Sequence, residues 1–135
     1  MKKISFVINT AKNELDHLKL LLESLELNLD RKDHEILIFI DSDNQGTLEV
    51  LKSLQPRFKD MKIITHKLNP CVGYSRNKNI MVDKAKYDII SYLQSDMVIS
   101  PHYDTDVIEC LEDDCILSAT RVEPPLHGES ETTIT

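Results

Sequence analysis

The sequence contains no tryptophan and only three glycines among its 135 residues, which excludes a collagen-like or glycine-rich repeat. Long apolar runs are missing as well. The longest, residues 36–40, has five residues, whereas a membrane-spanning helix needs about 20. The N-terminal segment reaches the polar Asn9 too early for the apolar core of a secretory signal. We therefore expect no transmembrane segment.

Basic residues are scarcer than acidic ones. There are 16 Lys and Arg against 23 Asp and Glu, which gives a formal net charge of −7. This balance argues against a nucleic-acid partner, because such binding depends on neutralising phosphates. The three cysteines, Cys71, Cys110 and Cys115, form an odd set without a Cys-x-x-Cys pair. A disulfide scaffold or a zinc site is not indicated, and we expect reduced thiols in a cytoplasmic protein.

The residues that are present predict alternating strands and helices. Short apolar runs rich in β-branched residues predict strands, whereas leucines recurring at steps of three and four between Leu15 and Leu29 predict an amphipathic helix. The expected strands are 4–8, 36–40, 61–65, 88–93 and 115–119, and the other expected helices are 47–54, 73–85 and 101–111. Pro101 is expected in the first turn of the last helix.

This alternation predicts an α/β fold with a mostly parallel sheet between two layers of helices, a three-layer α/β/α sandwich. The length suits a single domain, which we place at residues 1–121. Residues 122–135 begin with Val122 and contain Pro124-Pro125 followed by a polar stretch, and we expect them to form a loosely ordered C-terminal tail.

Polar segments follow four of the expected strands. They are Asn9-Thr10, Asp41-Ser42-Asp43, the segment from Asn69 to Arg76, and Gln94-Ser95-Asp96. Ligands of parallel α/β sheets bind beyond the carboxyl ends of the strands. We therefore expect these four segments to border a common ligand site.

The side chains in these segments suit a nucleoside diphosphate with a bridging metal ion. Asp41 can accept a hydrogen bond from a base N–H or a ribose hydroxyl, and Asp96 can bind Mg²⁺ or Mn²⁺. Arg76, in the first turn of a helix, can contact a phosphate or stack on a base. Taken singly, each also has an ordinary structural explanation, because aspartates cap turns and arginines line solvated helix faces.

In series, these segments resemble the donor-binding half of the inverting family 2 glycosyltransferases, which have the GT-A (Rossmann-like) fold. The matching segments keep Thr10, Asp41 with the following Gly46-Thr47, the Gly73, Arg76 and Asn77 of a loop-to-helix motif, and Asp96. The family's Asp-x-Asp metal motif is reduced here, since Gln94 stands at the first acidic position.

The resemblance implies a role for each matching residue. Thr10 would lie beside the base and ribose, Asp41 would bind the base, and Arg76 would contact the base or phosphates. Gln94 would bind a ribose hydroxyl, and Asp96 would hold a divalent cation, Mn²⁺ or Mg²⁺. The implied donor is a UDP- or GDP-sugar, and the implied reaction is metal-assisted transfer of the sugar to an acceptor. The sequence names neither the base, the sugar nor the acceptor.

The resembling domain is usually much longer than this chain, and the extra part supplies the acceptor site and the general base. We therefore expect a truncated GT-A domain, to which no catalytic residue is assigned. The alternative is a non-catalytic nucleotide-binding module or a fragment of a longer enzyme. A sugar-nucleotide nucleotidyltransferase and a response-regulator-like domain fit less well, because residues 9–13 hold neither a glycine-rich signature nor an acidic pair. Apolar surface left uncovered in a truncated domain predicts a homodimer or a poorly soluble monomer.

Overall fold

A computed structural model describes residues 2–10, 14–41, 46–66, 74–111, 116, 122–123 and 133–134, with the backbone alone for 66, 74–77, 122–123 and 133–134. In chain order, the elements are β1 (Ile4–Thr10), α1 (Leu15–Asn28), β2 (Glu35–Asp41), α2 (Thr47–Leu54), the short 3₁₀ helix η1 (Gln55–Arg57), β3 (Met61–His66), α3 (Tyr74–Lys84), β4 (Ile89–Gln94), α4 (Tyr103–Cys110), β5 (Val122–Glu123) and β6 (Thr133–Ile134).

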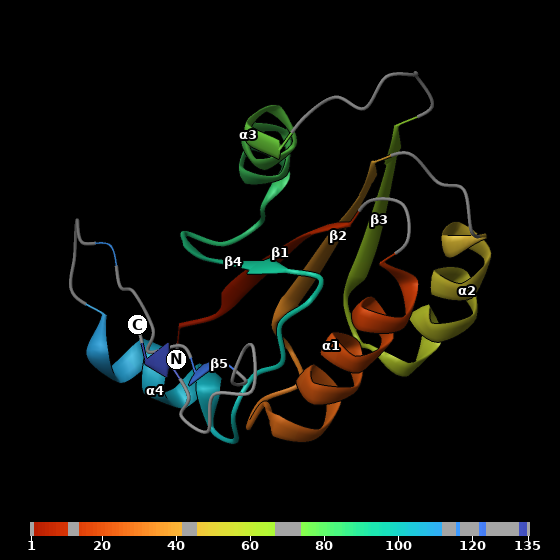
Figure 1. Cartoon of the computed structure of the whole chain (residues 1–135). Helices are drawn as coiled ribbons and strands as arrows, with labels where there is room; N and C mark the ends of the chain where they lie inside the picture. Colours follow the sequence, from red (N-terminus) through yellow and green to blue (C-terminus); the bar gives the residue numbers. More distant parts are fainter. Residues whose placement is uncertain are drawn as a thin grey trace.

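The main sheet contains four parallel strands in the order β3-β2-β1-β4. Helix α3 covers one face of this sheet, while α1, α2 and α4 lie on the other face (Figure 1). The predicted three-layer sandwich with a parallel sheet is therefore confirmed. No helix in the described part of the chain combines the length and the hydropathy that a membrane crossing needs.

The two faces of the sheet bury side chains of alternating positions along each strand, as the period of two requires. In β1, Phe6 and Ile8 face the layer of α1, α2 and α4, whereas Val7 faces α3. The central strands β1 and β2 are buried on both faces, which explains their nearly continuous apolar sequence. The larger core lies against α1, and its fully buried leucines are Leu18, Leu21, Leu22 and Leu25.

Helix α4 begins at Tyr103, so the expected place of Pro101 in its first turn is wrong. The residue before the helix, His102, has a left-handed backbone with φ of 63°. This conformation separates Pro101 from the helix. It is held by a hydrogen bond from the His102 backbone N–H to the carbonyl of Asn28, at the end of α1.

The expected fifth strand at 115–119 falls almost entirely outside the described residues. Only Ile116 of that segment is described, and it belongs to no strand. Beyond the expected boundary at residue 121, β5 and β6 pair with each other in an antiparallel ladder. The division into a domain and a loosely ordered tail stays a prediction.

A buried carboxylate, Asp104, joins α4 to the connection between α1 and β2. It accepts hydrogen bonds from the backbone N–H groups of Asp30 and Arg31, each at 3.0 Å, and from Nε2 of His34 at 2.9 Å. Nδ1 of His34 accepts the backbone N–H of Ile4 at 3.0 Å. His34 is therefore the neutral tautomer that carries its proton on Nε2.

A second buried carboxylate, Glu35, fixes the amino ends of the strands. It accepts hydrogen bonds from Ser5 Oγ at 2.8 Å, from Lys62 Nζ at 2.9 Å and from the backbone N–H of Lys86 at 2.8 Å. Burial raises the pKa of Glu35, but these three donors lower it more, so the net pKa is below the usual value. The end of α3 is thereby tied to the amino edge of the sheet.

Candidate functional site

The carboxyl ends of the strands bring most of the predicted site positions to one edge of the sheet. The register places Asn9 opposite Gln94 on β4, and Thr10 opposite Ile40 on β2. Asp41, the next residue of β2, ends that strand opposite His66. Strands β2, β1 and β4 are neighbours, so Asp41 and Gln94 lie on either side of the end of β1.

Asp41 and Gln94 belong to the same face of the sheet. Phe39 and Tyr92, each two positions earlier on its strand, pack in the core beneath α3, and the alternation puts Asp41 and Gln94 on that side. Asn9 shares this face with Val7. The α3 face of the edge therefore carries two amides and a carboxylate.

Thr10 lies on the opposite face, with Ile8 and Ile40. Its side chain is fully buried, and its Oγ1 has no hydrogen-bond partner among the described residues. The structure therefore separates Thr10 from Asp41 and Gln94. An unpaired hydroxyl in this position costs free energy unless a further group satisfies it.

Asp41 is only 4% exposed and Gln94 is half-buried, and both interact with other parts of the protein. These side chains therefore lie beneath the surface at this edge of the sheet and do not project from it. Two of the polar segments expected to border the site, 42–45 and 69–73, lie outside the described residues.

The first turn of α3 lies at the same edge. The helix packs on β1 and β2, and the residue that follows it closely, Lys86, is bound to Glu35 at the amino edge. The beginning of α3, including the backbone of Arg76, is therefore at the carboxyl edge on the face of Asp41 and Gln94. A helix start presents free N–H groups and a partial positive charge, which attract anions.

The turn after β4 carries Asp96, whose side chain is exposed. A hydrogen bond of 3.1 Å from the backbone N–H of Met97 to the carbonyl of Gln94 closes this turn. Ser95 is fully buried, and its hydroxyl donates to the carboxylate of Glu14, the residue that caps α1. The turn is therefore anchored to α1, while Asp96 projects from it at the surface.

The parallel sheet with its flanking helices is shared with known proteins. The family model described as "Glycosyl transferase family 2" matches residues 6–128. The chain belongs to this family. A search of curated protein sequences finds no match.

Several solved structures share this fold. S. aureus TarS has a TM-score of 0.68 at 21% identity, over 79% of this chain and 19% of that one. A TarS fragment, residues 1–349 in complex with UDP-GlcNAc, has a TM-score of 0.71 at 20% identity, over 79% and 30%. The mannosyltransferase PcManGT from Pyrobaculum calidifontis, in complex with GDP-Man and Mn²⁺, has a TM-score of 0.69 at 16% identity, over 83% and 33%.

These likenesses establish the GT-A fold of the family 2 chain. The chain spans between a fifth and a third of the length of these structures. The expectations of a family 2 glycosyltransferase N-terminal part and of a GT-A sandwich are therefore confirmed.

The oxygen ligands that the described residues offer fit a cation that is bound together with a diphosphate. No group of three or more His, Cys, Asp or Glu side chains in the described ranges is arranged to hold a metal ion. Asp96 is the carboxylate at the turn, and Gln94 offers an amide oxygen. Mg²⁺ and Mn²⁺ are commonly held by one or two carboxylates together with phosphate oxygens, and an exposed carboxylate at this turn is compatible with that arrangement.

Glu14 is the residue of this edge to which the sequence analysis gave no role. It follows the loop after β1 and precedes α1, and it reaches Ser95 across the sheet edge. The topology already implied its position, because every residue between a parallel strand and the next helix lies at the carboxyl edge.

Proposed function

We propose that the chain is the donor-binding part of a family 2 glycosyltransferase and binds a nucleotide-diphospho-sugar at the carboxyl edge of its sheet. The observation that carries the proposal is the placement of Asp41 and Gln94 on one face, beside the first turn of α3. The proposal is supported by structures of the same fold that contain UDP-GlcNAc or GDP-Man.

Most of the predicted side chains have a role in this proposal. Asp41 accepts a hydrogen bond from the base, and Gln94 binds a ribose hydroxyl. Arg76 and the start of α3 offset the charge of the diphosphate. Thr10, fully buried on the other face of β1, has no direct contact with the donor in this proposal. Asp96 supplies the protein ligand of a Mn²⁺ or Mg²⁺ ion. That ion, when bound, neutralises charge on the leaving diphosphate.

Sugar transfer in this proposal needs an acceptor site and a general base, and no described residue is assigned to either. The nucleotide-binding part alone is a binding module. Transfer to an acceptor hydroxyl therefore requires a further segment or a partner that provides both. The nature of the acceptor and a cytoplasmic location stay predictions from the sequence.

A calorimetric titration with UDP and GDP, each with and without Mn²⁺, tests the donor site. We expect saturable binding of one nucleotide, strengthened by Mn²⁺. Asp96→Asn removes the charge of the metal ligand without changing its size, and we expect it to abolish the Mn²⁺ effect while leaving metal-free binding intact.

Asp88→Asn is the matched control, because Asp88 is an exposed aspartate at the opposite end of the same strand. It should bind as the unmodified chain does. An Mn²⁺ effect that survives in Asp96→Asn would contradict the metal role. Absence of binding to both nucleotides by a chain with a cooperative unfolding transition would contradict the donor site.

A further inference from the structure

A hollow of about 180 Å³ lies at the amino end of the sheet, opposite the proposed donor site. Its walls come from the end of α1, the connection to β2, and the segment between η1 and β3. The apolar part of the lining is Leu29, Ile36 and Phe58, and the basic part is Arg31, Lys32, Arg57 and Lys59. An apolar floor with a basic rim is unusual in a chain whose net charge is −7.

The two carboxylates of the lining are already paired. Glu26 accepts two hydrogen bonds from the guanidinium of Arg57, and Asp60 accepts one from Lys86 Nζ at 2.6 Å. His34 also lines the hollow, but both of its ring nitrogens are occupied by Ile4 and Asp104. None of these three groups is left to neutralise the remaining cations.

The other basic side chains of the lining are Lys32, Lys59 and Arg31, and their hydrogen-bond donors are only partly used by the described residues. Lys32 donates to the carbonyls of Glu26 and Leu29, and no carboxylate of the described residues pairs with it. Lys59 is exposed and makes no ion pair with any described residue. Arg31 pairs with Asp33 through Nη2 at 2.5 Å, while its Nη1 is buried without a hydrogen-bond partner in the described part of the chain.

We infer that this hollow binds a small organic anion, with a single carboxylate or phosphate head on an apolar body the size of one aromatic ring. The exposed ammonium groups of Lys32 and Lys59 in the lining are the donors that an anionic head would meet. The volume suits this size, because a cavity of about 150 Å³ holds benzene. The amino ends of the strands are a strand's length away from the proposed donor edge, so this site is separate from it.

Titration with phenyl phosphate and with phenylacetate tests the inference and distinguishes the two head groups. We expect one of them to bind saturably, and more tightly than inorganic phosphate or benzyl alcohol. Inorganic phosphate lacks the apolar ring, and benzyl alcohol lacks the negative charge. Backbone amide shifts in the NMR spectrum should change at Arg31 and at residues 58–60. They should not change at Gln94 or at the start of α3.

Two variants and one control make the test decisive. Lys32→Gln and Lys59→Gln should each weaken binding severalfold, because a charge-assisted hydrogen bond is lost. Lys52→Gln removes the same charge from an exposed position on α2 outside the lining and should bind as the unmodified chain does. If Lys32→Gln does not fold, Lys59→Gln decides.

Each of the following results would overturn the inference. They are the absence of saturable binding by either aryl anion, equal binding by Lys59→Gln and Lys52→Gln, and shift changes confined to the carboxyl edge. Equal affinity for benzyl alcohol would also overturn it, since the basic rim would then contribute nothing.

Discussion

Asp104 shows how a single buried carboxylate can hold two distant segments together. Burial raises its pKa, but the N–H groups of Asp30 and Arg31 and the Nε2–H of His34 lower it more, so the net pKa is below the usual aspartate value of 3.8. The stabilisation is therefore fully present above the unfolded pKa and is lost as the pH falls through the lower folded pKa.

We expect Asp104→Asn to reduce the free energy of unfolding by about 2–3 kcal/mol at neutral pH, because three hydrogen bonds to a charged acceptor are weakened. The unmodified chain should lose this advantage as the pH falls below the usual aspartate pKa of 3.8, so the two stability curves should converge at acid pH. Urea unfolding over this range measures the effect. Asp106→Asn, an exposed change on the same helix, is the control, and an equal loss in that variant would contradict the role of Asp104.

His102 responds to pH in the opposite direction. Its hydrogen bond to Asp30 Oδ1, at 2.6 Å, and the charge of that carboxylate raise the pKa of His102 above 6.5. The contact therefore stabilises the fold below the unfolded pKa and is lost as the pH rises through the higher folded pKa.

The ring protons of His102 in an NMR titration measure this shift directly. We expect a midpoint above 6.5 in the unmodified chain and a return toward 6.5 in Asp30→Asn, which keeps the size of the side chain but removes its charge. An unchanged midpoint in that variant would rule out the Asp30 contact in solution.

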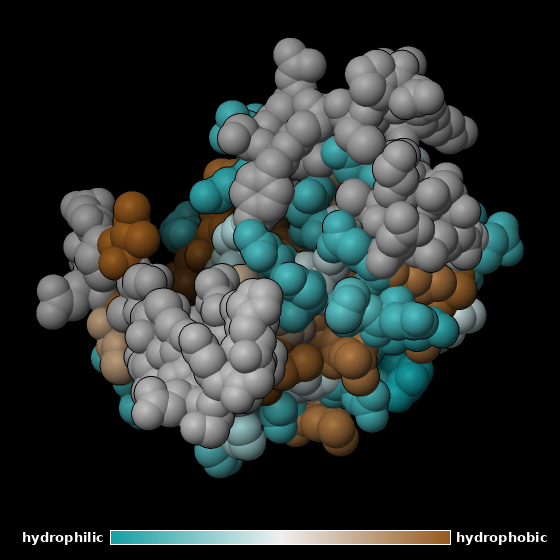
Figure 2. All heavy atoms as spheres, in the orientation of Figure 1, coloured by the Kyte–Doolittle hydropathy of each residue, from teal (hydrophilic) through white to brown (hydrophobic). Residues whose placement is uncertain are grey.

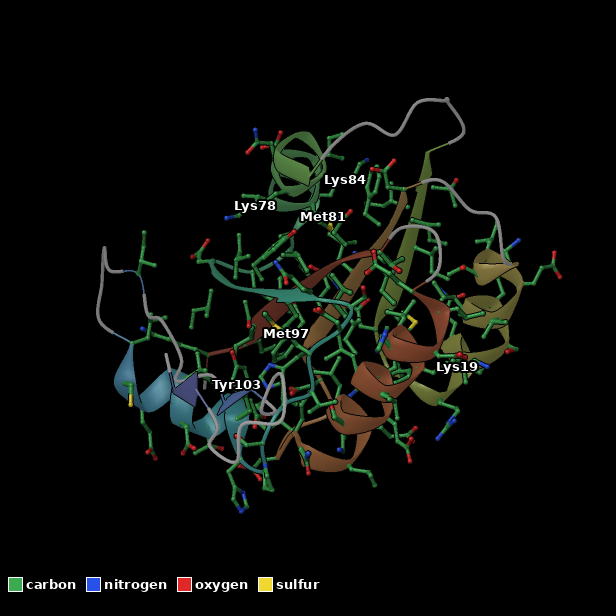
Figure 3. The ribbon with its side chains drawn as sticks, viewed as in Figure 1. Lys19, Lys78, Met81, Lys84, Met97 and Tyr103 are labelled. Atoms are coloured by element: carbon green, nitrogen blue, oxygen red, sulfur yellow. The ribbon has the colours of Figure 1, made fainter. Side chains whose placement is uncertain are left out.

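Among the elements, α3 matters most for the proposed donor site, because its first turn lies at the carboxyl edge. Met81 points from this helix toward the sheet, where it is fully buried against Val7, Leu37 and Phe39 (Figure 3). Lys78 lies over the ring of Tyr92 with its Nζ 4.9 Å from the ring centroid. The position of the helix start therefore depends on side chains one to two turns further along.

We expect Met81→Ala to lower the free energy of unfolding by about 2–4 kcal/mol, as for other methionines removed from a core, and to weaken UDP or GDP binding. Val82→Ala changes the next residue, which is 39% exposed, and should cost less than about 1 kcal/mol. Thermal unfolding and the nucleotide titration measure both effects. Similar losses in the two variants would contradict the anchoring role of Met81.

The elements themselves were predictable from the sequence, whereas several contacts between them were not. The apolar run at 36–40 and the leucines of α1 indicated β2 and the larger core. Burial on both faces leaves a continuous apolar run in a strand, and burial on one face leaves a helical period. The left-handed His102 and the buried Asp104 gave no such signal. Their conformations depend on Asn28, Asp30 and His34, more than sixty positions earlier in the chain.

The location of the candidate site was predictable from the sequence, but the set of residues that lie on its face of the sheet was only partly predictable. Asp41 and Gln94 follow buried strands, and the topology alone brings them to one edge. The separation of Thr10 onto the other face depends on the exact end of β1, which extends to Thr10, beyond the expected end at Ile8. Alternation assigns Thr10 to a face only if the strand continues regularly to that residue, and sequence patterns do not fix strand ends so closely.

On the scale of the whole molecule, the chain leaves large apolar side chains at its surface. Leu27 is 72% exposed and Val98 is 66% exposed, and apolar patches lie between polar ones over α1 and α2 (Figure 2). Burial of such surface favours association. We therefore expect sedimentation equilibrium to show a concentration-dependent homodimer. A chain that stays monomeric at high concentration would contradict this prediction.

The strand order has a consequence for how the chain is made. The central strand β1 is synthesised first, but Ile4 lies opposite Ile89 of β4, which emerges from the ribosome much later. During synthesis at roughly 5–20 residues per second, the nascent chain therefore carries a very apolar strand with one edge open for seconds. Chaperone protection of the nascent chain is therefore needed most by β1, until β4 has emerged and can pair with it.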